Sequence, residues 1–219
     1  MSNKQSVNIH LSKAYLEMAR SYVNARCIYR EDLISDQTNI HNTETIRFAF
    51  ASLSVIYSYL AIEAFMNWAI HEIWKDVRNK NISFYNKEEI ENFEKLFLDK
   101  DAFETVIKNP KLKELKDRIN IVCRITNIKK ICEKDGKLWT SFTALHKQVR
   151  HNLVHPNSQS EIFSENTKKI MPIKAQKEFS EIASKIITHF YTASKYKGHV
   201  PNYLKNNTLF EISEIKLLL

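Results

Sequence analysis

Glycine is almost absent from this sequence: Gly136 and Gly198 are the two glycines among 219 residues. Loops that cradle phosphate groups and tight β-hairpins both depend on glycine, because other residues rarely adopt the backbone conformations involved. The scarcity therefore excludes P-loop, Rossmann-type and compact all-β proteins. Leucine, isoleucine, lysine, glutamate, asparagine and serine are common instead, which is typical of long helices joined by polar turns.

Cysteine is also scarce. The three cysteines, Cys27, Cys123 and Cys132, form no C-x-x-C pair, and residues 1–10 are polar rather than an apolar signal peptide. An odd number of cysteines without a secretory signal is typical of a protein in a reducing compartment. We therefore expect a reduced, cytoplasmic protein.

One apolar segment is long enough to cross a membrane. Residues 48–70 carry a single charge, on Glu63. Glu63, Asn67 and the serines of this segment would be costly to place in lipid, and no second span accompanies it. A helix that is apolar nearly all round is also typical of the centre of a soluble bundle. We predict a buried central helix rather than a membrane anchor.

Hydrophobic periodicity and capping residues predict an all-α protein. Helices are expected over residues 12–33, 42–78, 86–98, 109–126, 135–155 and 172–196. No repeat or low-complexity segment divides the chain, so we predict a single domain over residues 1–219. Its expected form is a helical bundle with one long central helix and additional short helices. The core is expected at about 46–196, and the apolar C-terminal tail, 200–219, is expected to dock on it.

Most of the formal net charge of +8 lies in one segment. Residues 108–137 hold ten basic and four acidic residues, a net charge of +6. Such a segment favours a polyanion such as RNA as partner, because phosphate contacts supply affinity that does not depend on sequence. The alternative is a solvated lysine face. The residues that we single out as RNA-binding candidates are Lys129, Lys130, Lys134 and Lys137.

Arg150 stands five residues before His155 in the stretch RHNLVHP, residues 150–156. Arginine stabilises phosphate oxyanions and keeps its charge, whereas histidine exchanges protons near neutral pH. Cleavage of an RNA backbone needs a base for the ribose 2′-hydroxyl, an acid for the leaving 5′-oxygen and a cation for the phosphorane. We therefore single out His155 as general base or acid and Arg150 as the phosphate-stabilising residue. The scheme requires no metal or cofactor.

One ideal helix does not bring these two side chains together, because Arg150 and His155 lie roughly 140° apart around its axis. Proline at position 156 pushes His155 out of helical geometry, and a two-fold dimer would bring two copies of this helix end together. The structural alternative is a surface arginine and a histidine that is favoured by the helix dipole.

The motif helix has an apolar stripe at helical spacing, which indicates that it packs against a core. The stripe consists of Leu138, Phe142, Leu145, Val149 and Leu153. Asn152 falls near this stripe and needs a buried hydrogen-bond partner. Glu63 and Asn67, on the central helix, are the expected partners. We predict that His151 and Asn152 position the catalytic groups or the RNA.

His151 and His155 offer a rival chemistry, because residues four apart share a face of a regular helix and this is the spacing of zinc ligands. The stretch lacks the glutamate of H-E-x-x-H, and no third ligand is evident. We therefore predict no metal site.

In Arg150 and His155 the chain resembles the R-x4-6-H signature of the HEPN superfamily, small α-helical domains that are often metal-independent ribonucleases. His151 fills the polar position after the arginine, and the segment EAFMN, residues 63–67, is similar to the earlier core helix of the family. The resemblance spans roughly residues 46–196. It implies a homodimer whose paired motifs line an RNA-cleaving cleft, as in toxins and phage-defence effectors.

Asn157, two residues after His155, differs from the residue found in one group of HEPN toxins. HEPN toxins that are regulated by a partner nucleotidyltransferase often carry a tyrosine two residues after the motif histidine. That partnership is therefore not expected, and another antitoxin or regulatory protein is the candidate partner. The alternative function is a non-catalytic HEPN-type module that binds nucleic acid or a protein.

Overall fold

The computed structural model describes residues 11–24, 40–97, 112, 114–148, 170, 173–191 and 204. Within these ranges the chain consists of helices joined by turns, so the prediction of an all-α protein is confirmed for them. After an N-terminal helix at 11–24, the helices are α2 (Ile40–Arg78), α3 (Lys87–Phe97), α5 (Leu115–Ile125), α6 (Ile131–Lys134), α7 (Gly136–Gln148) and α9 (Ile173–Tyr191).

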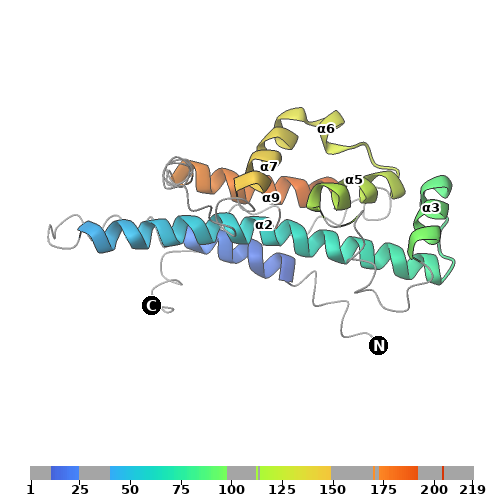
Figure 1. The fold of residues 1–219 in the computed structure, drawn as a ribbon, viewed down its shortest axis with the longest axis horizontal. Coiled ribbons are helices and arrows are strands. Elements are labelled where there is room, and N and C mark those ends of the chain that lie inside the picture. The colour runs from blue at the N-terminus through green and yellow to red at the C-terminus, as the bar shows by residue number, and fades with distance from the viewer. Residues whose placement is uncertain are drawn as a thin grey trace.

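Helix α2 is the axis of the described structure (Figure 1). The helix at 11–24 lies along one side of α2, where the Ser12 hydroxyl donates to the Ala61 carbonyl oxygen at 2.8 Å. Helices α5 and α9 pack along the other side, and α6 and α7 form a further layer above them. Helix α3 lies at the end of α2 and contacts α5. The long central helix with shorter partners is thus as predicted.

The hydrophobic core follows α2. Ile62 and Met66 are completely buried, and the Phe65 ring centre lies 5.9 Å from that of Phe190 on α9. Ile119 brings α5 into the same cluster. Each such side chain contributes roughly 1.5–3 kcal/mol by leaving water. Packing therefore holds the central helix more strongly than its intrinsic helix propensity does.

Among the described helices, α2 is long and apolar enough, over Ile46–Arg78, to cross a membrane. Half of its most apolar window is nevertheless buried inside the protein. Burial by other helices is what the core helix of a bundle requires. The packing of α2 therefore agrees with the predicted role as a central core helix.

Two helices begin at the capping residues that the sequence indicates. The Asn86 side-chain oxygen accepts the Glu89 N–H at 3.3 Å, at the start of α3. The Asp135 carboxylate accepts the Leu138 N–H at 2.9 Å, at the start of α7. Each bond satisfies a backbone donor that has no partner within the helix. These local signals account for the correct prediction of both starts.

Other boundaries differ from the prediction. Helix α2 begins at Ile40 rather than after a cap at 42–43. The helix expected from residue 109 begins as α5 at Leu115, because Glu114 has an extended backbone with φ −89° and ψ 138°. The Leu112 carbonyl oxygen instead accepts the Arg118 Nε–H at 2.6 Å. A continuous helix would use this carbonyl for the backbone N–H four residues later. The short helix α6 was not predicted, since one turn has no periodicity.

Helices α2 and α5 end in the same way, without glycine. Lys80 and Asn127, which follow them, have left-handed φ values of 56° and 55°. After α2, the Asn81 N–H donates to the Asp76 carbonyl oxygen at 2.8 Å, and an equivalent bond of 2.9 Å closes α5. This pattern is the Schellman motif, which satisfies carbonyl groups that are orphaned at a helix end.

The predicted C-terminal tail is described at one residue. Leu204 is 6 % exposed, and its carbonyl oxygen accepts the Ser184 hydroxyl of α9 at 3.0 Å. This residue therefore docks on α9. The rest of 200–219 lies outside the described residues, as do residues 25–33 of the first predicted helix.

Candidate functional site

Helix α7 leads directly to the predicted motif, because it is described up to Gln148, two residues before Arg150. Phe142 and Leu145 are completely buried, and Leu138 packs partly buried against the core. This part of the apolar stripe is therefore confirmed. Helix α7 packs against both α9 and α2 (Figure 1). The structure thus fixes the helix that precedes the motif.

The predicted catalytic residues Arg150 and His155 lie outside the residues that the structure describes, and so do the predicted positioning residues His151 and Asn152. Their roles stay predictions. Within the described residues, no group of three or more His, Cys, Asp or Glu side chains is arranged to hold a metal ion. The histidine pair of the alternative zinc site belongs to the same undescribed segment.

Glu63 and Asn67, one turn apart on α2, are both bound by Arg118 of α5. The Arg118 Nη1 group donates to Glu63 Oε1 at 3.1 Å and to Asn67 Oδ1 at 2.8 Å. The Arg118 side chain is 8 % exposed, whereas that of Glu63 is 32 % exposed. Charge-assisted bonds to several acceptors offset the cost of burying a guanidinium group. Glu63 and Asn67, which were expected to bind Asn152 and to hold the motif helix in position, thus share a partner, Arg118, that was not predicted.

His146 ties the last turn of α7 to α2 and to the start of α5. Its Nε2 atom lies 3.6 Å from Glu114 Oε2. Its ring meets Tyr59 and Phe142 edge to face, with ring centres 5.7 and 6.2 Å away. The His146 side chain is 9 % exposed and that of Glu114 is 34 % exposed. The helix end that precedes the motif is therefore held by polar as well as apolar contacts.

These side chains form one polar row, which consists of Tyr59, Glu63, Asn67, Glu114, Arg118 and His146. Intervals of four residues put Tyr59, Glu63 and Asn67 on one face of α2, and Glu114 directly precedes α5, which carries Arg118. The basic side chains are buried, while the two carboxylates keep an edge toward solvent. Fixed carboxylate oxygens of this kind accept hydrogen bonds from a neighbouring amide, hydroxyl or imidazole group.

The inward orientation of Arg118 leaves nine basic residues of the segment 108–137 as candidates for contact with a polyanion. This arginine is one of its ten basic residues, yet it does not face a polyanion. Its position between the buried residues Leu115 and Val122 was the signal, because residues three and four apart share a helix face. In the same way, His146 follows Phe142 by four residues on the buried stripe.

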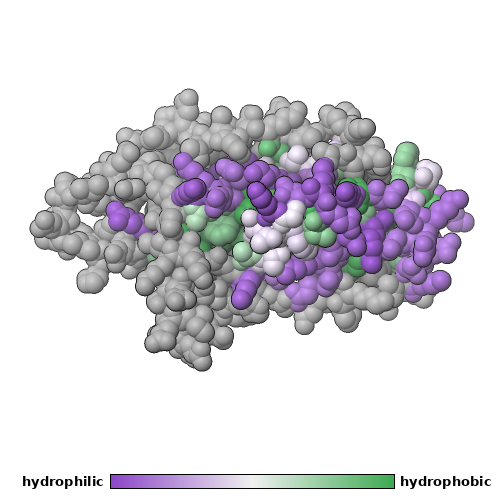
Figure 2. Space-filling model, turned by 90° about the horizontal axis from the view of Figure 1, so that it is seen from above, coloured by the Kyte–Doolittle hydropathy of each residue, from purple (hydrophilic) through white to green (hydrophobic). Residues whose placement is uncertain are grey.

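The four lysines predicted to bind RNA lie around α6 and the start of α7: Lys129, Lys130, Lys134 and Lys137. Lys130 is 42 % exposed and forms an ion pair of 3.9 Å with Glu133; the other three are exposed. The described residues on this face of the molecule are mainly hydrophilic (Figure 2). Along α7, Lys137 and His146 of the polar row are nine residues apart, which is about 14 Å along the helix axis.

Cys123 is excluded as a nucleophile by its surroundings. Burial raises the pKa of its thiol to about 12, while a hydrogen bond with the backbone of Ile131 opposes the shift. The thiol therefore stays protonated near neutral pH, and only the thiolate reacts readily.

His189 couples the stability of the fold to pH. Burial lowers its pKa below 6.5, a hydrogen bond with the backbone of Lys129 opposes this, and the charge of Lys134 lowers the pKa further. The ring Nε2–H donates to the Lys129 carbonyl oxygen at 2.9 Å, since a carbonyl only accepts. As the pH falls below 6.5, the unfolded chain takes up a proton before the folded chain does. The contribution of His189 to the free energy of unfolding is therefore complete above this pH and is lost as the pH falls below it.

A His189→Gln variant keeps an N–H donor but does not titrate. We expect its free energy of unfolding to fall less than that of the wild type between about pH 7 and 5. Urea unfolding at a series of pH values measures the difference. Parallel pH profiles for the two proteins would contradict the assigned role of His189.

No family model, curated protein or solved structure matches this chain. A functional assignment therefore depends on the motif in the sequence, on the polar row and on the lysines at the other end of α7.

Proposed function

We propose that this protein is a metal-independent endoribonuclease of the HEPN type, which acts in the cytoplasm as a toxin or phage-defence effector. His155 removes the proton from a ribose 2′-hydroxyl or returns one to the leaving oxygen. Arg150 stabilises the negative charge of the phosphorane. Attack by the 2′-oxygen breaks the phosphorus–5′-oxygen bond, leaving a 2′,3′-cyclic phosphate and a 5′-hydroxyl.

The observation that carries this proposal is the polar row beside the last turn of α7. In the HEPN resemblance, an acidic and an amide residue of the earlier core helix face the motif, and here these are Glu63 and Asn67. Arg118 holds both at hydrogen-bond distance. One turn away on α2, Tyr59 contacts His146, four residues before the motif arginine. This arrangement supports a preorganised polar surface for the motif.

A homodimer accounts for the two proton transfers that the reaction needs. One chain supplies one His155 and one Arg150, whereas a two-fold dimer supplies two of each. His151 and Asn152 then position these groups or the RNA. The lysines near α6 add attraction for RNA that is independent of its sequence. An antitoxin or regulatory protein would restrain the activity in the cell.

The test is incubation of the purified protein with labelled structured and single-stranded RNAs in EDTA. We expect cleavage without added metal and products that end in 2′,3′-cyclic phosphate, because the scheme relies on side chains alone. The ends are identified by their conversion with a phosphatase that opens cyclic phosphates. A folded dimer that leaves transfer, ribosomal and messenger RNA intact would contradict the proposal and favour a module that binds nucleic acid or protein.

A further inference from the structure

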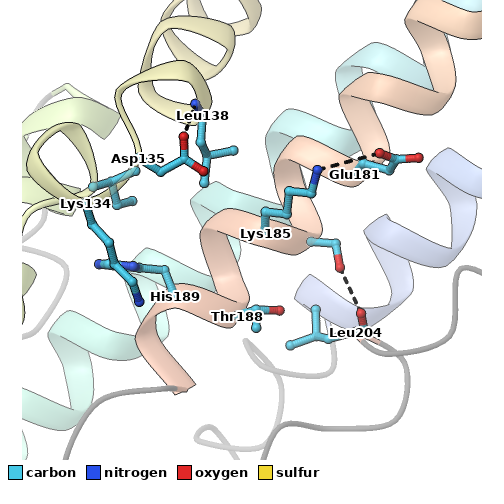
Figure 3. A pocket seen from close by; sticks show the side chains of 10 residues that line it. Lys134, Asp135, Leu138, Glu181, Lys185, Thr188, His189 and Leu204 are labelled. Carbon is cyan, nitrogen blue, oxygen red and sulfur yellow. Dashed lines mark hydrogen bonds and ion pairs between the residues drawn. The ribbon is translucent and has the colours of Figure 1, made fainter.

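A pocket of about 490 Å³ opens between α6, the start of α7 and α9 (Figure 3). We call it the α6–α9 pocket. Its lining includes Ile131, Lys134, Leu138, Lys185, Thr188 and His189. Its volume lies within the range of small-molecule sites, roughly 300–1,000 Å³. The pocket is large enough for a ligand the size of a nucleotide.

The lining combines an apolar wall with two lysines, so it favours a ligand that has both an apolar part and an anionic part. Ile131 and Leu138 offer an apolar wall. Lys134 lies beside His189 at one end, and Lys185 lies near Glu181 at the other (Figure 3). A ligand that suits both features has a flat apolar body and an anionic group.

The acidic residues of the pocket are already engaged. The Asp135 carboxylate caps α7 through the Leu138 N–H. Glu181 pairs with Lys185 at 3.8 Å, and these side chains are 45 % and 64 % exposed. An exposed pair of this kind contributes little and exchanges readily. Among the described residues, Lys134 forms no ion pair and is the cation most available to a ligand.

The backbone around the pocket adds to this preference for anions. Helix α7 begins at Gly136, and a helix N-terminus carries a partial positive charge. Beyond its chain neighbours and its own helix backbone, no heavy atom lies within 4 Å of the point where a Gly136 Cβ would stand, so the space beside this turn is open. Lys129 and Lys137 are exposed nearby. The site therefore has a cavity, a free lysine and a helix start in one place.

We propose that the α6–α9 pocket binds a nucleoside phosphate, either as a free nucleotide or as one unit of an RNA strand. The base lies on the apolar wall of Ile131 and Leu138, and the phosphate pairs with Lys134. The Thr188 hydroxyl offers a hydrogen bond to the sugar. This inference does not rest on the proposed cleavage reaction, because binding is measured without turnover.

The experiment is calorimetric titration of the full-length protein with adenosine monophosphate, inorganic phosphate and a short single-stranded RNA. We expect adenosine monophosphate to bind more tightly than inorganic phosphate, which lacks a body for the apolar wall. A Lys134→Met variant should weaken nucleotide binding by at least about tenfold, the value of one charge-assisted hydrogen bond. The matched control is Lys95→Met, an exposed lysine on α3, which should bind as the wild type does.

The arms of the titration separate the two sources of the ligand. Binding of the free nucleotide indicates a small-molecule site, and binding of RNA alone, lost in Lys134→Met, indicates a substrate subsite. Equal affinity for phosphate and nucleotide would overturn the assignment. Equal nucleotide affinity of wild type and Lys134→Met would also overturn it. The same holds if neither adenosine monophosphate nor the RNA binds at concentrations up to about 10 mM.

Discussion

An Arg150→Ala variant is expected to cleave RNA about 10²- to 10³-fold more slowly than the wild type, which is the cost of removing one donor to a developing oxyanion. A His155→Ala variant is expected to lose about 10²- to 10⁴-fold, because no group then transfers the proton at the 2′-oxygen or the leaving oxygen. Single-turnover cleavage of labelled RNA in EDTA measures both rates. These are the largest effects that follow from the proposed function.

The control is Arg124→Ala, which removes an exposed arginine of α5. Its Nε lies 3.5 Å from Glu89 Oε2, and its side chain is 48 % exposed. A surface ion pair contributes about 1 kcal/mol or less, so this variant should keep both fold and activity. Circular dichroism and sedimentation establish that each variant keeps the fold and the oligomeric state of the wild type. Unchanged cleavage by a folded Arg150→Ala variant would exclude the assigned role.

The second large effect concerns stability. An Arg118→Ala variant is expected to lose about 3 kcal/mol of unfolding free energy, at the lower end of the range for a broken buried ion pair. The lower end applies because Glu63 keeps 32 % of its surface and water can solvate its carboxylate. The variant also loses the bonds to Asn67 and to the Leu112 carbonyl oxygen. Urea unfolding, monitored by tryptophan fluorescence, gives the difference.

Two further variants test whether the loss of stability comes from the polar row or from the removal of any arginine of α5. Arg118→Lys keeps the charge but lacks the planar fork that reaches several acceptors, so its stability should lie between wild type and Arg118→Ala. Arg124→Ala, on the same helix, should change stability by less than about 1 kcal/mol. Equal losses in Arg118→Ala and Arg124→Ala would show that the polar row contributes nothing beyond a surface pair.

The fold was most predictable where the signals are local. Asn86 and Asp135 cap their helices through residues three positions later, so the starts of α3 and α7 are visible in the sequence. The start of α5 was not visible, because it depends on the contact between Arg118 and the Leu112 carbonyl. The same side chain also binds Glu63 and Asn67, which are more than fifty residues away in the sequence, and helix propensity carries no information about such contacts.

In the candidate site, too, the local features were predictable and the contacts between distant residues were not. Glu63 and Asn67 stand out in the sequence, because they are polar residues on an apolar helix and need partners. Their observed partner is Arg118, which belongs to the basic segment that was expected to favour a polyanion. Arginine is rarely buried, and burial depends on neighbours far away in the sequence. The spacing of Arg118 among apolar residues was the one local sign of its inward position.

The Schellman ends of α2 and α5 have a consequence for the protein's resistance to heat. Lys80 and Asn127 hold left-handed backbones with a Cβ atom present, which costs roughly 1–2 kcal/mol for an ordinary residue and less for asparagine. Both positions lie outside the polar row and the lining of the α6–α9 pocket. Glycine at either helix end would remove this cost and raise the melting temperature, and it would leave the proposed sites unchanged.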